Sequence, residues 1–115
     1  MKLITAAMEK TFRKYPFDSQ DGKDRDSVIL AKFFGGCACT WLVTEAGKQE
    51  DGDWLFFGWV NLGYGWECGY FSFSEIKNLR FPPFGLGLER DMYLEKGITV
   101  REYMKQYMYD DEEVI

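Results

Sequence analysis

The stretch Trp41–Phe73, WLVTEAGKQEDGDWLFFGWVNLGYGWECGYFSF, contains most of the information about the fold. It holds three runs rich in β-branched and aromatic residues, at 41–45, 54–60 and 67–73. An acidic loop separates the first two runs, and a Gly-rich turn separates the last two. Runs of this kind with turn signals between them are typical of an antiparallel meander. The stretch therefore predicts three neighbouring strands of one sheet.

The run 54–60 is apolar on both faces of the predicted strand. Alternation divides its side chains into two sets, Trp54, Phe56 and Val60 on one face and Leu55, Phe57 and Trp59 on the other. An antiparallel strand with one wet face should alternate apolar and polar residues. This strand is therefore either central and covered on both sides, or it displays aromatic side chains to a partner. Gly58 and Gly69 lie inside strand patterns, where glycine marks a bulge or a ring lying over the backbone.

The segments before this stretch predict a helix, a loop and a further strand. Thr5 is a suitable N-cap for a short helix with Met8 and Phe12 toward the core, and Pro16 ends it. Residues 15–27 are polar and mixed in charge, as in a solvated loop. Val28–Phe34 is the first predicted strand, and the second is expected over Cys39–Glu45.

Beyond the stretch, two further helices and a short strand are predicted. Ser74 is expected to cap a short helix over residues 74–79, and residues 89–94 could add a fifth strand. Thr99 and Glu102 have the spacing of a capping box, which predicts a helix through Tyr107. We therefore expect an α+β fold, with a four- or five-stranded antiparallel meander and N- and C-terminal helices packed on it.

Length and composition limit the organisation of the chain. Its 115 residues suit one domain, which we expect over residues 1–109, followed by a disordered acidic tail at 110–115. Leu3 and Ile4 are flanked by polar residues, so no signal peptide or transmembrane run is expected. We expect a cytoplasmic protein.

The formal net charge of −5 is unevenly distributed. Residues 110–113 carry −4, residues 33–73 also carry −4, and residues 1–14 carry +3. The aromatic stretch therefore has an acidic surround. Because phosphate contacts from Lys and Arg dominate affinity for nucleic acids, direct nucleic-acid binding by this sheet is not expected.

The residue types present exclude several kinds of chemistry. The chain has no His, which excludes nucleophile arrangements of the Ser-His and Cys-His type. Cys37, Cys39 and Cys68 are the only cysteines, and their spacing does not supply the four tetrahedral ligands of a structural zinc site. We therefore expect no metal and no cofactor, and we expect Cys39 and Cys68 to pack as small apolar residues.

Carboxylates are the remaining candidates for catalysis. In an extended Glu89-Arg90-Asp91 segment the two carboxylates share a face, where they could act as acid and base or bind magnesium. Glu45 and Glu67 could join them in one pocket. The alternative is that Arg90 pairs with an acidic neighbour at the sheet edge and sets the register of the C-terminal segment.

Aromatic side chains are the candidates for binding a partner. Aromatic residues anchor protein interfaces, and acidic groups steer association toward basic surfaces. The candidate binding residues are Trp41, Trp54, Trp59, Tyr64, Trp66, Tyr70 and Arg90.

Five short motifs occur in order over residues 28–94. They are Lys32-Phe33-Phe34, Trp41-x-x-Thr44-Glu45, Phe57-Gly58-x-Val60, Gly69-Tyr70-Phe71-Ser72 with Glu75, and Gly85-Leu86-Gly87-Leu88-Glu89-Arg90-Asp91 with Tyr93. This series resembles a DUF2958-like family of short bacterial proteins of unknown function, often carried by plasmids, phages and integrated conjugative elements. The resemblance implies a mobile-element setting and no catalytic assignment.

Three functions follow as expectations. The first is a non-enzymatic binding module of a mobile element, which would occupy a basic surface on a host or element-encoded protein, such as a defence nuclease targeted by anti-restriction or anti-CRISPR proteins. The second is a metal-assisted enzyme that acts on phosphodiester or nucleotide substrates through Glu45, Glu67, Glu89 and Asp91. The third is a homodimeric accessory protein that pairs through its sheet edge.

Overall fold

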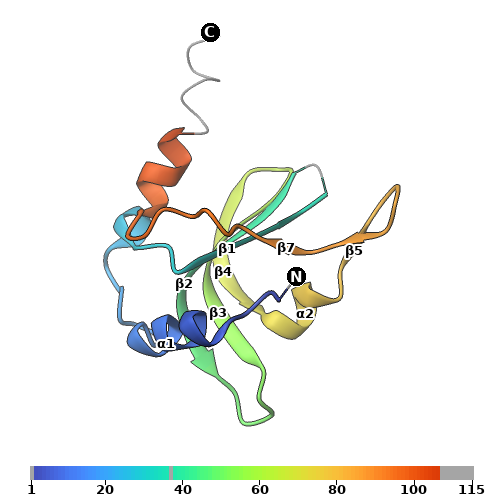
Figure 1. The fold of residues 1–115 in the computed structure, drawn as a ribbon. Helices are drawn as coiled ribbons and strands as arrows, with labels where there is room; N and C mark the ends of the chain where they lie inside the picture. Colours follow the sequence, from blue (N-terminus) through green and yellow to red (C-terminus); the bar gives the residue numbers. More distant parts are fainter. Residues whose placement is uncertain (1, 37, 107–115) are drawn as a thin grey trace, which may run out of the picture.

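A computed structural model of the chain describes residues 2–36 and 38–106 (Figure 1). Within them, the main sheet has five antiparallel strands in the order β4-β3-β2-β1-β7. The strands are β1 (Ala31–Gly35), β2 (Cys39–Lys48), β3 (Trp54–Leu62), β4 (Trp66–Ser72) and β7 (Glu89–Arg90). Strands β1 to β4 each pair with the next along the chain, which confirms the predicted meander.

Helices precede, interrupt and follow the strands along the chain. They are α1 (Ala6–Lys14), α2 (Phe73–Lys77), the short 3₁₀ helix η1 (Asp24–Asp26) and a C-terminal helix that begins at residue 100 and is described to residue 106. The α+β class is therefore confirmed. The predicted acidic tail, Tyr107 and Cys37 lie outside the described residues.

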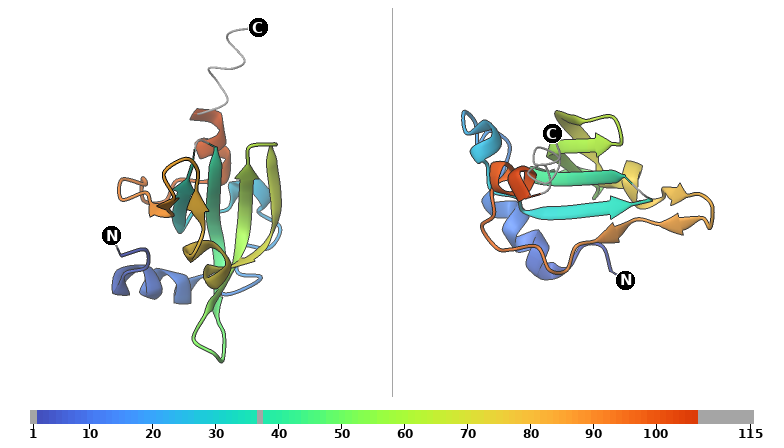
Figure 2. Two further views of the ribbon diagram at one scale, coloured as in Figure 1. Left: turned by 90° about the vertical axis from the view of Figure 1, so that its right-hand side faces the viewer. Right: turned by 90° about the horizontal axis from the view of Figure 1, so that it is seen from above.

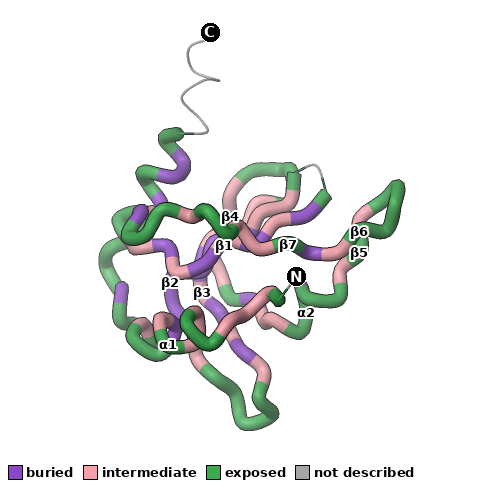
Figure 3. The backbone as a smooth tube through the Cα atoms, in the orientation of Figure 1, coloured by how far each residue is buried: buried purple, intermediate pink, exposed green. Residues whose placement is uncertain are grey.

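Two short strands, β5 (Arg80–Phe81) and β6 (Leu86–Gly87), form a separate hairpin that projects beyond the main sheet (Figure 2). Buried residues concentrate in the strands of the main sheet, whereas the β2–β3 turn and the tip of this hairpin are exposed (Figure 3). Among the described helices, none has the length and apolar character needed to cross a bilayer.

The first face of the sheet carries an aromatic core. Phe12 of α1 is fully buried, and its ring packs edge-on against Trp54 at 5.1 Å and against Phe56 at 5.2 Å between centroids. Thr5 caps α1 by accepting a hydrogen bond from the Met8 N–H at 3.2 Å, as predicted. The sequence signals for this helix and for its inward Phe12 are therefore confirmed.

The second face is covered in part by the C-terminal helix. A second buried cluster joins Leu42 of β2 to Val100, Tyr103 and Met104, with Trp59 and Trp66 half-buried beside it. Thr99 and Glu102 form the predicted capping box, because each side chain bonds the backbone N–H of the other residue at 3.1 Å.

A β-bulge interrupts the pairing of β2 with β3. The register shifts between Val43 and Glu45, opposite Gly58, where a Cβ would overlap the Leu42 carbonyl oxygen. Gly58 therefore marks a bulge, as predicted. Gly69 marks neither a bulge nor an overlying ring, because a Cβ there would meet open space.

Several predicted boundaries are wrong; β2 and β3, for example, run on to Lys48 and Leu62. The first strand begins at Ala31, because the Ile29 N–H donates to Ile98 and the Leu30 N–H to Val43, so the chain changes partners before the ladder begins. Helix α2 begins one residue earlier than expected, with Ser72 as its N-cap, while Ser74 bonds Asp53. The fifth strand is only β7, which returns to pair with β1.

Candidate binding site

The tryptophans predicted to bind a partner lie in different environments. Trp41 and Trp54 are each only 4% exposed and belong to the core of the first face, so their assignment as surface anchors is wrong. Trp54 is covered by α1, because the Phe12 ring packs on it and its Nε1–H donates to the Glu9 carboxylate at 3.2 Å. Trp59 and Trp66 are half-buried on the second face.

The two predicted tyrosines are at the surface. Tyr64, in the turn between β3 and β4, is 98% exposed, and Tyr70 of β4 is 63% exposed. Tyr70 pairs with Phe57 across the strands, and its ring contacts Phe57 at 4.9 Å and Phe17 at 5.6 Å between centroids. These two contacts hold the Tyr70 ring in place while leaving it accessible.

Arg90 lies at the β7 edge of the sheet and is half-buried. Its Nε–H donates to the Lys2 carbonyl oxygen at 3.2 Å, and its backbone pairs with Phe33 of β1. Arg90 thus connects the N-terminal segment to the sheet edge.

The four candidate catalytic carboxylates are not brought together. Glu67 lies on β4 and Glu89 on β7, at opposite edges of the sheet. Asp91 forms an ion pair with Lys32 at 3.6 Å. In the part of the chain that the structure describes, no group of three or more Cys, Asp or Glu side chains could hold a metal ion.

Glu45 instead anchors the loop at 15–27 onto the second face. Its two carboxylate oxygens accept hydrogen bonds from the backbone N–H groups of Asp18 at 3.1 Å and Gln20 at 2.8 Å. The buried Gln20 amide bonds the Val28 backbone N–H and carbonyl oxygen and the Thr44 carbonyl oxygen. The loop at 15–27, which was expected to be solvated, is therefore hydrogen-bonded to β2 through Asp18 and Gln20. The sequence did not predict these hydrogen bonds, because no residue near Gln20 in the sequence indicates that it will contact β2.

Beside this loop lies a hollow of about 350 Å³, which we call the acidic aromatic recess. Its walls come from the loop and from strands β2, β3 and β4, and the residues that define it are Asp18, Asp21, Asp24, Glu45, Trp59 and Tyr70. Among the described residues that line it, every charged side chain is acidic. The recess therefore offers aromatic rings in a negative electrostatic environment.

The pKa of the Cys68 thiol is affected by this negative environment. Burial raises the pKa of Cys68, and the negative charges of Asp24 and Glu45 raise it further. Cys68 pairs with Trp59 across β3 and β4 and lines the recess, and the residue as a whole is exposed. The expectation that Cys68 packs as a small apolar residue is therefore wrong. Cys39, for which the same was expected, lies half-buried against the first-face core.

Comparison with known proteins identifies the family. The model of the family described as "Protein of unknown function (DUF2958)" matches residues 3–112, nearly the whole chain. The chain belongs to the DUF2958 family. No curated protein and no solved structure matches it.

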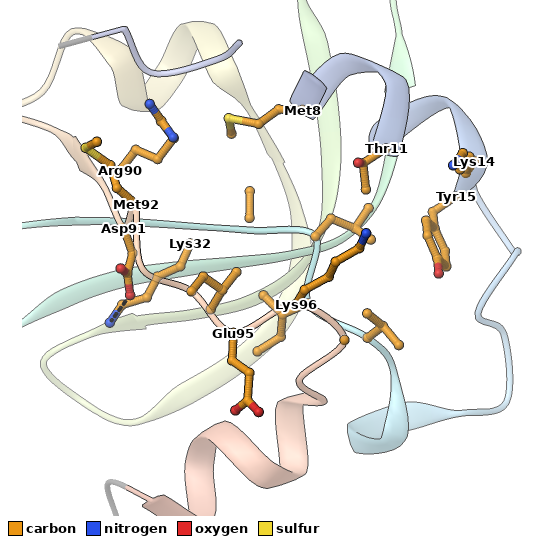
Figure 4. Close-up of a pocket in the computed structure, with 16 residues that line it drawn as sticks. Met8, Thr11, Lys14, Tyr15, Lys32, Arg90, Asp91, Met92, Glu95 and Lys96 are labelled. Atoms are coloured by element: carbon orange, nitrogen blue, oxygen red, sulfur yellow. Dashed lines mark ion pairs between the residues drawn. The ribbon is translucent and has the colours of Figure 1, made fainter. Parts of the chain in front are cut away.

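The DUF2958 chain has a second hollow, of about 430 Å³, between α1, residues 28–32 and residues 90–97 (Figure 4). Arg90 and Met92 lie at one end of this groove and Lys14 and Tyr15 at the other, with Lys96 between them (Figure 4). Lys32 is engaged by Asp91 and also lies 4.9 Å from the centroid of the Tyr103 ring. The lining of the groove includes both basic side chains, such as Lys14 and Lys96, and acidic ones, Asp91 and Glu95, unlike the lining of the recess.

Proposed function

We propose that this DUF2958 protein is a protein-binding module that uses the acidic aromatic recess to occupy a basic surface on a partner. The observation that carries the proposal is the recess itself, which combines the accessible ring of Tyr70 with four acidic side chains, those of Asp18, Asp21, Asp24 and Glu45. Aromatic side chains supply most of the energy at protein interfaces, and complementary charge speeds association and selects the partner.

A defence nuclease of the bacterial host is the kind of partner that we propose. Enzymes that act on DNA contact its phosphates through Lys and Arg, so their substrate clefts are basic. An acidic surface of the kind found here would compete with DNA for such a cleft. The resemblance to proteins carried by plasmids and phages supports this setting, in which the protein would act in the host cytoplasm.

The test is a DNA-cleavage assay with a panel of purified bacterial restriction endonucleases and CRISPR effector nucleases. We expect the wild-type protein to inhibit at least one of them. The double variant Asp21→Asn/Asp24→Asn removes two recess charges without changing side-chain size, and should weaken that inhibition roughly tenfold at low salt.

The matched control is Glu50→Gln/Glu89→Gln, which removes the same charge from exposed positions outside the recess. This control should inhibit like the wild type. If both double variants inhibit equally well, the recess is not the binding surface. If no nuclease in the panel is inhibited, the nuclease proposal is wrong.

The broader binding proposal can be contradicted by light scattering. A stable homodimer whose interface covers Trp59 and Tyr70 would leave no recess for a foreign partner. We expect instead a molar mass equal to that of the monomer, 13.5 kDa.

A further inference from the structure

One cation of the chain itself already lies against the recess. Arg25, in η1, places its guanidinium carbon 5.3 Å from the centroid of the Trp59 ring. A guanidinium at this distance from an indole is held by the quadrupole of the ring, and Arg forms such contacts more often than Lys. The Trp59 ring is therefore oriented so that a guanidinium can stack on it.

Trp59 and the recess carboxylate Glu45 are held by contacts that do not involve Arg25. Trp59, in β3, pairs with Leu42 of β2 on one side and with Cys68 of β4 on the other. Glu45 is fixed by the two backbone hydrogen bonds from the loop. Because these groups are ordered by the fold, a bound cation would meet a pre-formed site.

Arg25 itself is attached loosely. Arg25 is exposed, and its neighbour Asp26 in η1 forms an ion pair with Arg101 at 2.8 Å. The side chain can therefore leave the Trp59 ring without disturbing the backbone that carries it. An exposed cation–π contact is weak, so an incoming group with additional partners can replace it.

The recess chemistry suits a guanidinium better than a metal ion. The lining of the recess supplies carboxylates and rings, and among the described residues no three acidic or thiol groups lie close enough together to hold a metal. A guanidinium uses both features, since its flat face stacks on a ring while its N–H groups donate to carboxylates.

We infer that the acidic aromatic recess binds the side chain of an arginine from the partner protein, which takes the place of Arg25 on the Trp59 ring. This inference rests on the proposed function, because it assumes a protein partner, and it names the group that the recess recognises. The charge complementarity of the recess and the guanidinium already found there are its two supports.

The experiment titrates the full-length protein with two blocked tripeptides, acetyl-Gly-Arg-Gly-amide and acetyl-Gly-Lys-Gly-amide. Binding is followed by NMR through the indole N–H resonance of Trp59, assigned with a Trp59→Phe variant. We expect the arginine peptide to shift this resonance saturably and to bind about two- to fivefold more tightly than the lysine peptide.

The decisive variant is Arg25→Ala, which uncovers the ring. It should tighten binding of the arginine peptide by about two- to fivefold, the factor that corresponds to an exposed cation–π contact. Lys23→Ala is the matched control, because it removes one positive charge from an exposed neighbouring position without uncovering Trp59. It should change the affinity less than Arg25→Ala does.

Three outcomes would overturn the inference. These are the absence of any Trp59 shift with the arginine peptide, equal or weaker binding to Arg25→Ala than to the wild type, and a larger shift with calcium or magnesium chloride than with the peptide. If the Asp21→Asn/Asp24→Asn variant no longer inhibits a nuclease that the wild type inhibits, but the arginine peptide does not bind, the proposed function is supported and only the arginine inference is wrong. If the arginine peptide binds but no protein partner is found, the proposed function is wrong and only the guanidinium site is supported.

Discussion

Gly58 shows how one missing side chain sets the geometry of the sheet. It lies in β3 directly opposite the point where the register of β2 shifts, and the Leu42 carbonyl oxygen occupies the space of its absent Cβ. Because the bulge inserts Thr44 between the paired residues, it places Val43 in the first-face core and Glu45 on the second face. The recess therefore depends on this glycine.

We expect Gly58→Ala to lower the free energy of unfolding by about 2–3 kcal/mol, because the new methyl group can fit only if the bulged backbone moves. Urea denaturation followed by circular dichroism measures the change. Gly69→Ala is the matched control, since its added Cβ meets open space, and it should change stability by less than about 0.5 kcal/mol. Equal costs for the two variants would contradict the close approach at Gly58.

Trp54 and Trp59, five positions apart on one strand, should have different roles. We expect Trp54→Ala to lower the free energy of unfolding by about 3–5 kcal/mol, as large-to-small changes in a core do. Trp59→Ala removes a half-buried ring and should lower the free energy of unfolding by only about 1–2 kcal/mol. Equilibrium urea unfolding of both variants tests this, and a similar cost for the two would contradict the difference in burial.

At the scale of elements, the C-terminal helix depends on its first turn. Its buried residues Val100, Tyr103 and Met104 cover part of the second face next to Leu42. The Thr99 backbone N–H and hydroxyl both donate to the Glu102 carboxylate, and the Glu102 N–H bonds the Thr99 hydroxyl. The cap therefore positions the side chains that cover one end of the sheet.

We expect Thr99→Ala to lower the free energy of unfolding by about 1 kcal/mol, the usual cost of losing an N-cap. Thermal and urea unfolding measure the change. Thr11→Ala is the control, because Thr11 lies inside α1, where alanine is the better helix former and stability should be maintained or slightly increased. A loss at Thr11 as large as that at Thr99 would show that the effect does not come from capping.

At the scale of the whole molecule, two carboxylates connect elements that are distant in sequence. Glu9 of α1 accepts hydrogen bonds from Trp54 Nε1 and from Lys48 Nζ, and the first of these contributes most to lowering the pKa of Glu9. Asp53 accepts hydrogen bonds from Ser74 at the start of α2. Burial acts to raise the pKa of Asp53, but the bonds from Ser74 and Trp54 outweigh it and lower the pKa.

These lowered pKa values predict a loss of stability in acid. A carboxylate whose pKa is lower in the folded than in the unfolded state stabilises the fold above its unfolded pKa of about 4, and loses that contribution as the pH falls through its folded pKa. The urea midpoint should therefore fall steadily below about pH 4. Glu9→Gln keeps an oxygen that can accept from Trp54 but does not titrate, so its midpoint should depend less on pH. A midpoint with the same pH dependence in the variant would contradict this role of Glu9.

Much of the fold could be predicted from local signals in the sequence. The meander follows from the apolar runs of β2, β3 and β4, whose residues contact their neighbours along the chain. The start of α1 and the capping box at Thr99 also depend on groups within a few residues of one another. Such interactions are visible in any short window of sequence.

The acidic aromatic recess could not be predicted from local signals, because tertiary contacts form it. Alternation divides β3 into two faces, but the packing of α1 and its Phe12 determines that Trp54 is buried while Trp59 remains accessible. The recess exists because Glu45 binds the backbone of Gln20, 25 residues earlier in the chain. A carboxylate in a sequence carries no sign of which distant N–H groups it will meet, so folding alone decides whether it becomes a catalytic group, a surface charge or the anchor of a loop.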